Sequence, residues 1–223
     1  EQDFAKLWDI NNQNNKEVIF AVQFSDDPVY NGDGNTFHLY WGSWYEDQPG
    51  MTRDLLNGRP YRRHRQTDKV MTELFDRKND SRFYKSFKWV YYANKSNTEV
   101  AIGDTAIYYS INSPSQAYRY RFYTWNSVDP SQNNRYYPSL LKHFDSSRAS
   151  VNDTQGLRDW VRMRLGETYL IAAEAAGRNN DFQKAANYIN VIRKRAAWHE
   201  GEEKMSQYWR EEGGDMNDTN DTY

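Results

Sequence analysis

Cysteine is absent from the 223 residues of this chain. The protein can therefore form no disulfide and can hold no zinc ion through thiolate ligands. Its four histidines (38, 64, 143 and 199) lie far apart and do not have the H-E-x-x-H spacing of a zinc enzyme. The serine nucleophile motif G-x-S-x-G is missing too. These absences leave no familiar hydrolase motif in the sequence.

Long apolar runs and an excess of one charge are also missing. No apolar run approaches the roughly 18 residues that suggest a transmembrane helix. The 29 basic and 31 acidic side chains give a net charge of −2, so the composition does not predict a nucleic-acid partner. One basic run, residues 59–65, is expected to be a solvated or salt-bridged segment, with contact to an anionic glycan as the alternative.

Aliphatic side chains are scarce, with ten Leu, ten Val and eight Ile, whereas aromatic ones are abundant, with 8 Trp, 18 Tyr and 10 Phe. Aromatic side chains bury a large area each, so the chain is expected to fold. It has too few aliphatic residues for a thick, regular core. The length allows one or two domains.

Local patterns predict several elements. Residues 17–24 are rich in β-branched and aromatic residues and predict a strand. The alternating aromatic and polar stretches of 82–125, notably 118–125, predict short hairpin strands. Residues 67–78 predict a helix capped by Thr67 or Asp68. A longer helix is expected over 157–176, with Trp160 and Val161 in its apolar stripe.

Gly177 is expected to end that helix, and Asp181 to cap a second one that packs antiparallel to it. The pair resembles a tetratricopeptide unit in carrying Leu165-Gly166-x-x-Tyr169 followed by Phe182-x-x-Ala185. The predicted fold class is therefore mainly α with extensive irregular loops and a few short β-hairpins, combining this helix pair with a loop-rich subdomain. The expected domains are a loop-rich part with short strands and one helix (1–150), the helical hairpin and its following segment (151–212), and a frayed polar tail (213–223).

The Gly-punctuated segment 38–50 carries three aromatic residues within five positions. Flat aromatic rings on exposed loops suit the apolar C–H faces of sugars, while nearby amides and carboxylates can bond the hydroxyls. The alternative for each ring is a place in the core, which is the expectation for Trp160 and Trp198. The predicted glycan-binding residues are Trp41, Trp44, Tyr45, Asn35, Asp47 and Trp125.

Two groups of oxygen-bearing side chains could support other functions, a calcium site or a glycosidase site. Asp27, Asn31 and Asp33 are weak calcium candidates among glycines, but they lack the EF-hand spacing, so a solvated turn is expected, with no metal and no other cofactor. Glu167 and Glu174 share a predicted helix face and could mimic the paired acids of a glycosidase. Arginines lie three or four residues away, which favours structural ion pairs.

Six segments, taken in order, resemble the SusD/RagB family, the surface nutrient-binding lipoproteins of Bacteroidetes. The resemblance implies non-catalytic capture of oligo- or polysaccharides and their delivery to a SusC-type TonB-dependent transporter at the outer membrane. It also implies a SusD-like but incomplete fold, since the family's upstream helices, lipid-bearing cysteine and terminal block have no counterpart here. The resembling segments are residues 16–24, 50–61, 80–83, 137–145, 164–175 and 185–196.

Two alternatives to sugar binding stay open. The chain could be a scaffold of the transporter complex whose helix pair docks a protein partner without touching sugar. More remotely, it could be a glycoside hydrolase.

Overall fold

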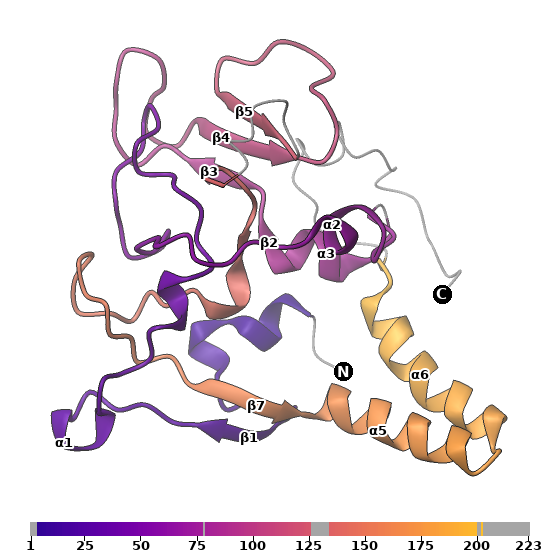
Figure 1. The fold of residues 1–223 in the computed structure, drawn as a ribbon. Helices are drawn as coiled ribbons and strands as arrows, with labels where there is room; N and C mark the ends of the chain where they lie inside the picture. The colour runs from indigo at the N-terminus through magenta and orange to yellow at the C-terminus, as the bar shows by residue number, and fades with distance from the viewer. Residues whose placement is uncertain (1–3, 78, 126–133, 200–201, 203–223) are drawn as a thin grey trace.

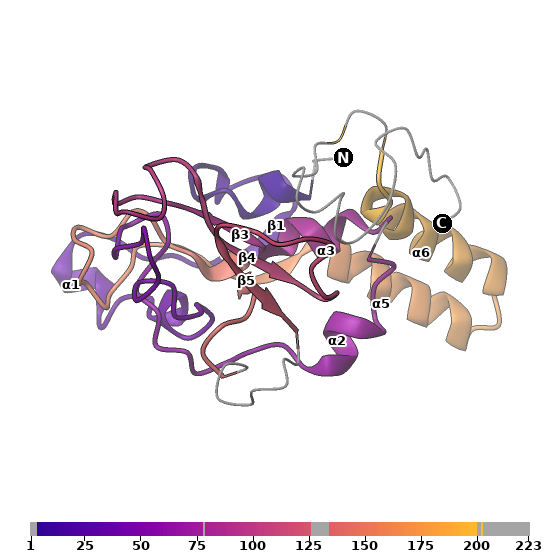
Figure 2. The same cartoon turned by 90° about the horizontal axis from the view of Figure 1, so that it is seen from above.

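The computed structural model describes residues 4–77, 79–125, 134–199 and 202. A body of loops, short helices and small sheets occupies most of the molecule. A hairpin of two longer helices, α5 (Leu165–Arg178) and α6 (Phe182–Ala196), extends from one end of this body (Figures 1 and 2). None of the described helices is long and apolar enough to cross a membrane.

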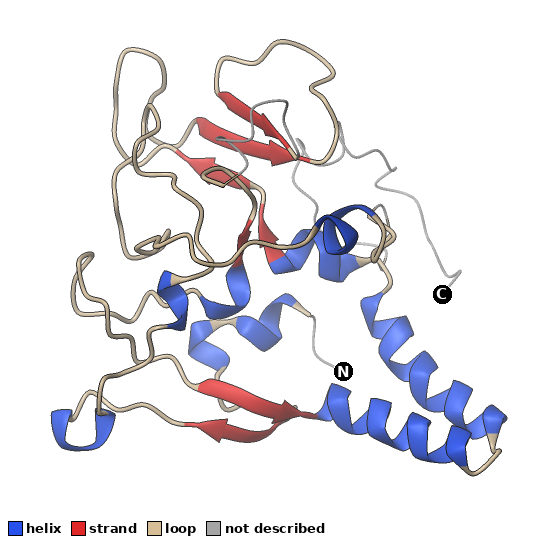
Figure 3. Cartoon of the chain, viewed as in Figure 1, coloured by secondary structure: helices blue, strands red, loops and turns tan. Residues whose placement is uncertain are grey.

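The remaining elements are short, as Figure 3 shows. The helices are α1 (Pro28–Asn31), α2 (Asp68–Thr72) and α3 (Ser81–Ser86), with 3₁₀ turns η1 (Ala5–Trp8), η2 (Ile10–Asn12), η3 (Phe37–Leu39) and η4 (Leu141–His143). The strands are β1 (Val18–Val22), β2 (Phe87–Lys88), β3 (Val90–Tyr92), β4 (Thr105–Ser110), β5 (Arg121–Thr124), β6 (Ser139–Leu140) and β7 (Trp160–Arg164).

These strands form three small sheets. β1 pairs antiparallel with β7, β2 with β6, and β3 with β4. The strand predicted over 17–24 is confirmed as β1. Its pairing with β7 joins the expected domain 1–150 to the segment that follows it. The short hairpin strands expected in 82–125 are confirmed for β3 and β4, which pair antiparallel, whereas β5, within 118–125, runs parallel to β4 and is not a hairpin strand. A parallel neighbour needs a longer connection than a hairpin turn, here residues 111–120.

The long helix predicted over 157–176 begins eight residues later, at Leu165. Trp160 and Val161 belong to β7 and pair with β1, so they are not part of a helical stripe. The helix also ends later than Gly177. Asn180, with φ 61°, follows its last turn, and the amide of Asp181 donates to the carbonyl of Ala176. The antiparallel helix pair is confirmed, whereas its likeness to a tetratricopeptide unit stays a prediction.

The helix predicted over 67–78 is much shorter and covers only α2. The Thr67 side chain caps it by accepting from the amide of Val70. Beyond its end, Asp76 accepts from the backbone and side-chain nitrogens of Asn79 and so forms a turn. This turn places Asp80, whose carboxylate caps α3. Competing side-chain bonds have therefore replaced the last two helical turns.

The core is mainly aromatic and lies where β2, β3, β4 and β6 meet. Trp89, Tyr91, Tyr108 and Tyr109 are at most 1% exposed. Trp198, just after α6, is also buried there, and its amide donates to Asn79, which fastens the base of the hairpin to the body. The core position expected for Trp198 is thus confirmed, whereas Trp160 is only partly buried.

Serine and tyrosine hydroxyls form a small network inside this core. Ser139 Oγ lies 2.7 Å from the Tyr91 hydroxyl and accepts from the amide of Ser43 at 2.8 Å. Ser43 Oγ lies 3.0 Å from the Tyr109 hydroxyl. The network joins the loop at residue 43 to β3, β4 and β6, so each polar tip has a partner without leaving the core.

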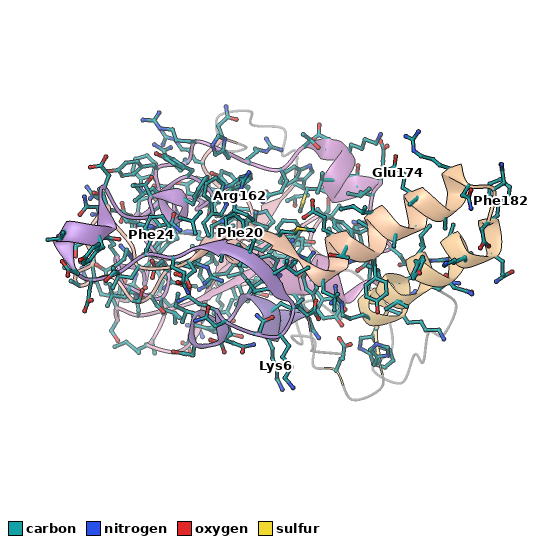
Figure 4. All side chains as sticks on the ribbon, turned by 90° about the horizontal axis from the view of Figure 1, so that it is seen from below. Lys6, Phe20, Phe24, Arg162, Glu174 and Phe182 are labelled. Atoms are coloured by element: carbon teal, nitrogen blue, oxygen red, sulfur yellow. The ribbon has the colours of Figure 1, made fainter. Side chains whose placement is uncertain are left out.

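Apolar side chains on the hairpin and on β1 remain exposed. Leu170, Ile171 and Phe182 are 53–69% exposed, and Phe20 of β1 is 60% exposed. Figure 4 shows Phe182 at the far tip of the hairpin. By contrast, Ala173 is buried between the helices.

Two glycines offer a matched test of this packing. Gly50 and Gly58 have φ of 79° and 80°, but a Cβ at Gly50 would collide with Cγ2 of Val100, whereas nothing lies within 4 Å of one at Gly58. We expect Gly58→Ala to cost about 1–2 kcal/mol of unfolding free energy through backbone strain alone. Gly50→Ala should cost roughly 1–3 kcal/mol more through overpacking. Urea unfolding measures both, and equal losses would contradict the packing described around Val100.

Candidate functional site

Three aromatic side chains and two polar ones gather beside β5. We call this set the aromatic surface: Trp44, Asp47, Gln48, Tyr123 and Tyr136. The Tyr123 and Tyr136 rings stack with centroids 4.4 Å apart and planes 14° apart. All three aromatic side chains are partly exposed, and Asp47 is exposed.

Backbone and side-chain bonds hold the two segments of the aromatic surface together. The amide of Trp44 donates to the carbonyl of Arg135 at 2.8 Å, so loop 44–48 runs beside residues 135–136. The Tyr136 hydroxyl donates to Asp47 Oδ2 at 2.7 Å, and the Tyr123 hydroxyl donates to Gln48 Oε1 at 2.7 Å. The phenol tips therefore fix the carboxylate and the amide beside the rings.

Burial sets the protonation of both phenols. It is the largest cause raising the pKa of Tyr123, and the neighbouring Tyr136 and Asp47 add to it. Burial also raises the pKa of Tyr136, with the hydrogen bond to Asp47 as the next cause. Both hydroxyls stay protonated at neutral pH and can act as the donors in these bonds.

Trp44 also carries cations on its ring. The Arg62 guanidinium carbon lies 3.9 Å from the ring centroid and that of Arg135 lies 5.4 Å away. Both distances are within the range of a cation–π interaction. The segment 38–50, which we call the aromatic loop, lies against the loop that contains Arg62. The amides of Arg63 and His64 hold the two loops together, because both donate to the carbonyl of Tyr40.

Three of the predicted glycan-binding residues are buried, and we correct them here. Tyr45 is 0% exposed, stacks on Tyr91 and donates its hydroxyl to the carbonyl of Gly58. Asn35 is 6% exposed, and its amide bonds the backbone of Phe37 and Arg158. These side chains are already used in packing and backbone bonding, so they lie outside the aromatic surface.

Trp125 is likewise 8% exposed and lies under the guanidinium of Arg65, 4.1 Å from its centroid. Its indole nitrogen donates to Asp68 at 3.0 Å. Trp41 is partly buried and contacts His64 and His143, with ring centroids 5.0 and 5.6 Å away. Of the predicted set, only Trp44 and Asp47 lie in the aromatic surface.

Sequence reasoning missed Tyr123, Tyr136 and the two arginines on Trp44. The alternation in 118–125 marked Tyr123 as a strand residue, but nothing in the spacing paired it with Tyr136. The basic run 59–65 was noted as a possible anionic-glycan contact, and Arg62 belongs to it. Only the fold brings these segments to the aromatic loop.

The acidic groups have structural partners. Asp27 accepts from the amide of Val29 and caps α1, and among the described residues no three His, Asp or Glu side chains gather as metal ligands would. Calcium binding by Asp27, Asn31 and Asp33 stays the untested alternative to the expected solvated turn. Glu174 forms an ion pair with Arg178 at 2.7 Å, which confirms the ion-pair interpretation for that carboxylate.

A cavity of about 410 Å³ lies on other elements, between the start of β1 and the helix pair. Its charged groups include Glu17 and Arg195, which bond each other. The remaining lining is formed by Lys16, Leu165, Gly166, Tyr169, Val191 and Ile192. With its main charges paired internally, this cavity is a weaker candidate for a sugar site than the aromatic surface.

Comparison with protein families gives one match. A family model described as SusD family matches residues 9–222. A solved structure of a SusD superfamily protein from Bacteroides fragilis is 23% identical, with a TM-score of 0.48, and the match covers 89% of this chain and 35% of that one. The chain thus spans about a third of the length of that protein. No curated protein matches the chain.

His143, which stacks on Trp41, gives a pH-dependent test of its own burial. Burial, with the charges of Arg158 and Lys142, lowers the pKa of His143 from 6.5 to about 4. The unfolded chain therefore binds the proton first, and this stabilising contribution, complete above pH 6.5, is lost as the pH falls towards 4. We expect His143→Phe, which keeps an aromatic ring, to remove on the order of 1–2 kcal/mol of the difference in unfolding free energy between pH 7.5 and 5. Urea unfolding at both pH values measures this difference in unfolding free energy. If the variant and the wild type show the same difference, the burial described for His143 is contradicted.

Proposed function

This chain belongs to the SusD family, as its sequence segments indicated, and on that premise we propose that it binds glycans without catalysis, through the aromatic surface. Membership of this family implies glycan binding for uptake. We further propose that the complete protein sits on the outer-membrane surface and delivers its glycan to a SusC-type TonB-dependent transporter.

One observation carries the proposal. Two partly exposed aromatic side chains, Trp44 and Tyr136, lie in adjacent bonded segments, with an exposed carboxylate fixed beside them at Asp47. Aromatic faces match the apolar faces of pyranose rings, and a fixed acceptor can bond sugar hydroxyls. Since the phenol bonds hold the acceptor in place, little ordering is needed on binding.

The partners of the acidic side chains support a non-catalytic role. Glu46, the other carboxylate of this loop, accepts from two nitrogens of Arg53 at 2.6 and 2.9 Å. A glycosidase needs two carboxyls facing one cleft, one of them protonated. Near the aromatic surface, Asp47 is held by Tyr136, and the neighbouring Glu46 is neutralised by its arginine.

A second candidate is the scaffold role, in which the helix hairpin docks onto a protein of the transporter complex. The exposed apolar side chains of α5 and α6, Leu170, Ile171 and Phe182, favour it. The two functions are separable because these side chains belong to the hairpin, whereas the aromatic surface belongs to the body (Figure 1).

The test of glycan binding is affinity electrophoresis in gels containing soluble polysaccharides. We expect Trp44→Ala to abolish the retardation of the protein, because the largest platform ring is lost. Tyr136→Phe keeps the stacked ring but removes the bond to Asp47, so its retardation should fall only partly.

The matched control is Tyr30→Ala, which removes an aromatic ring that is 78% exposed on α1. It should migrate as the wild type does, and circular dichroism should show unchanged helix content in all variants. Full retardation of Trp44→Ala would refute the site. If no polysaccharide retards the wild type and a SusC-type transporter captures it only with Phe182 intact, the scaffold role is supported instead.

A further inference from the structure

We propose that the glycan bound at the aromatic surface is anionic, carrying carboxylate or sulfate groups, and that Arg62 and Arg135 recognise these groups. This inference rests on the proposed function and names the class of its substrate. It starts from the two guanidinium groups that lie against Trp44.

Neither guanidinium has an acidic partner. No carboxylate of the described residues lies within 4.0 Å of the guanidinium nitrogens of Arg62 or Arg135. Other arginines nearby do have such partners, since Arg53 pairs with Glu46 and Arg65 lies 3.6 Å from Asp68, whereas Arg59 and Arg63 have no carboxylate ion pair among the described residues. The two cations on Trp44 therefore keep their charge available to a ligand.

Stacking leaves the hydrogen-bonding edge of a guanidinium unused. A guanidinium that lies over an aromatic face interacts through its plane, while its N–H groups point outward in that plane. Such a fork matches the two oxygens of a carboxylate or sulfate. Trp44 thus fixes the orientation of Arg62 and reduces the side-chain entropy that binding would otherwise cost.

The backbone at Arg62 supports a specific placement. Its φ is 53°, in the left-handed region that a residue with a long side chain rarely adopts. The conformation persists because the flanking amides of Tyr61 and Arg63 donate to the carbonyls of Leu39 and Tyr40. Strain of this kind, fixed by surrounding bonds, is typical of functional positions.

The acidic groups of the aromatic surface do not cancel this charge. Asp47 is its one carboxylate, and it already accepts from the Tyr136 hydroxyl and the Gln48 amide. Two unpaired cations beside one hydrogen-bonded anion leave a local positive excess, although the chain as a whole has a net charge of −2. A pyranose ring lying on the aromatic faces would place its acidic substituent near this excess.

The experiment compares charged and neutral polysaccharides in affinity gels at low and high salt. The anionic probes are polygalacturonate, alginate and chondroitin sulfate, and the neutral probes are laminarin, xyloglucan and galactomannan. We expect at least one anionic polysaccharide to be bound about tenfold or more tightly than every neutral one, with the difference shrinking at 0.5 M NaCl as screening increases.

The variants are Arg62→Gln and Arg135→Gln, each expected to weaken binding of the anionic polysaccharide about tenfold, and by more than any change in neutral binding. Arg62→Lys keeps the charge but loses the planar fork, so an intermediate loss is expected, and it serves if Arg62→Gln fails to fold. The charge-matched control is Lys184→Gln with Lys194→Gln, both exposed on α6, which should bind as the wild type does.

Three results would overturn the proposal: retention by neutral polysaccharides only, retention by none, or anionic binding that the arginine variants leave unchanged. Binding of a 20-residue oligothymidylate as tight as that of the best polysaccharide would also overturn it, because the surface would then be a general polyanion site. The Trp44→Ala variant distinguishes a failure of the proposed function from a failure of the charge assignment alone. If the function is wrong, Trp44→Ala leaves all retention intact; if only the charge assignment is wrong, Trp44→Ala still abolishes neutral binding.

Discussion

The hydroxyl network inside the aromatic core is the interaction on which the rest of this structure depends. With few aliphatic residues, the chain fills its interior with tyrosine, and each buried phenol needs a hydrogen-bond partner. Ser43 and Ser139 supply partners to Tyr91 and Tyr109 and tie the aromatic loop to three strands. An unpartnered hydroxyl at this depth would cost about 1–3 kcal/mol.

The same constraint separates core rings from surface rings within one loop. Tyr45 turns inward because its hydroxyl reaches the carbonyl of Gly58 inside the protein. Trp44, one residue earlier, turns outward, where Arg62 lies on its ring. The backbone of Trp44 is bonded to Arg135 and the next residue is anchored in the core, so the loop is held on both sides of the Trp44 ring. Such anchoring is what a binding platform needs.

Charged side chains also fall into two sets, those paired with an opposite charge and those stacked on Trp44. Some half-buried or buried ions are paired, as Arg53 with Glu46 in the body and Arg195 of α6 with Glu17 show. The cations over Trp44 are stabilised by the ring instead, which keeps them ordered without neutralising them. The helix hairpin is different again: its outer apolar side chains are exposed, and its ordered base is fastened by Trp198.

The sequence by itself determined the family, the β1 strand and the antiparallel helix pair, because these depend on local pattern and short spacing. It also predicted the Glu174–Arg178 pair, which needs only helical geometry. It misassigned Trp160 and Val161, since a β-branched and aromatic run can join a helix or a strand until a partner strand is known. Only the tertiary structure decided that Tyr45, Asn35 and Trp125 are buried while Trp44 meets Arg135 from some 90 residues away. Burial and long-range contact depend on where the whole chain packs, and no local spacing records that.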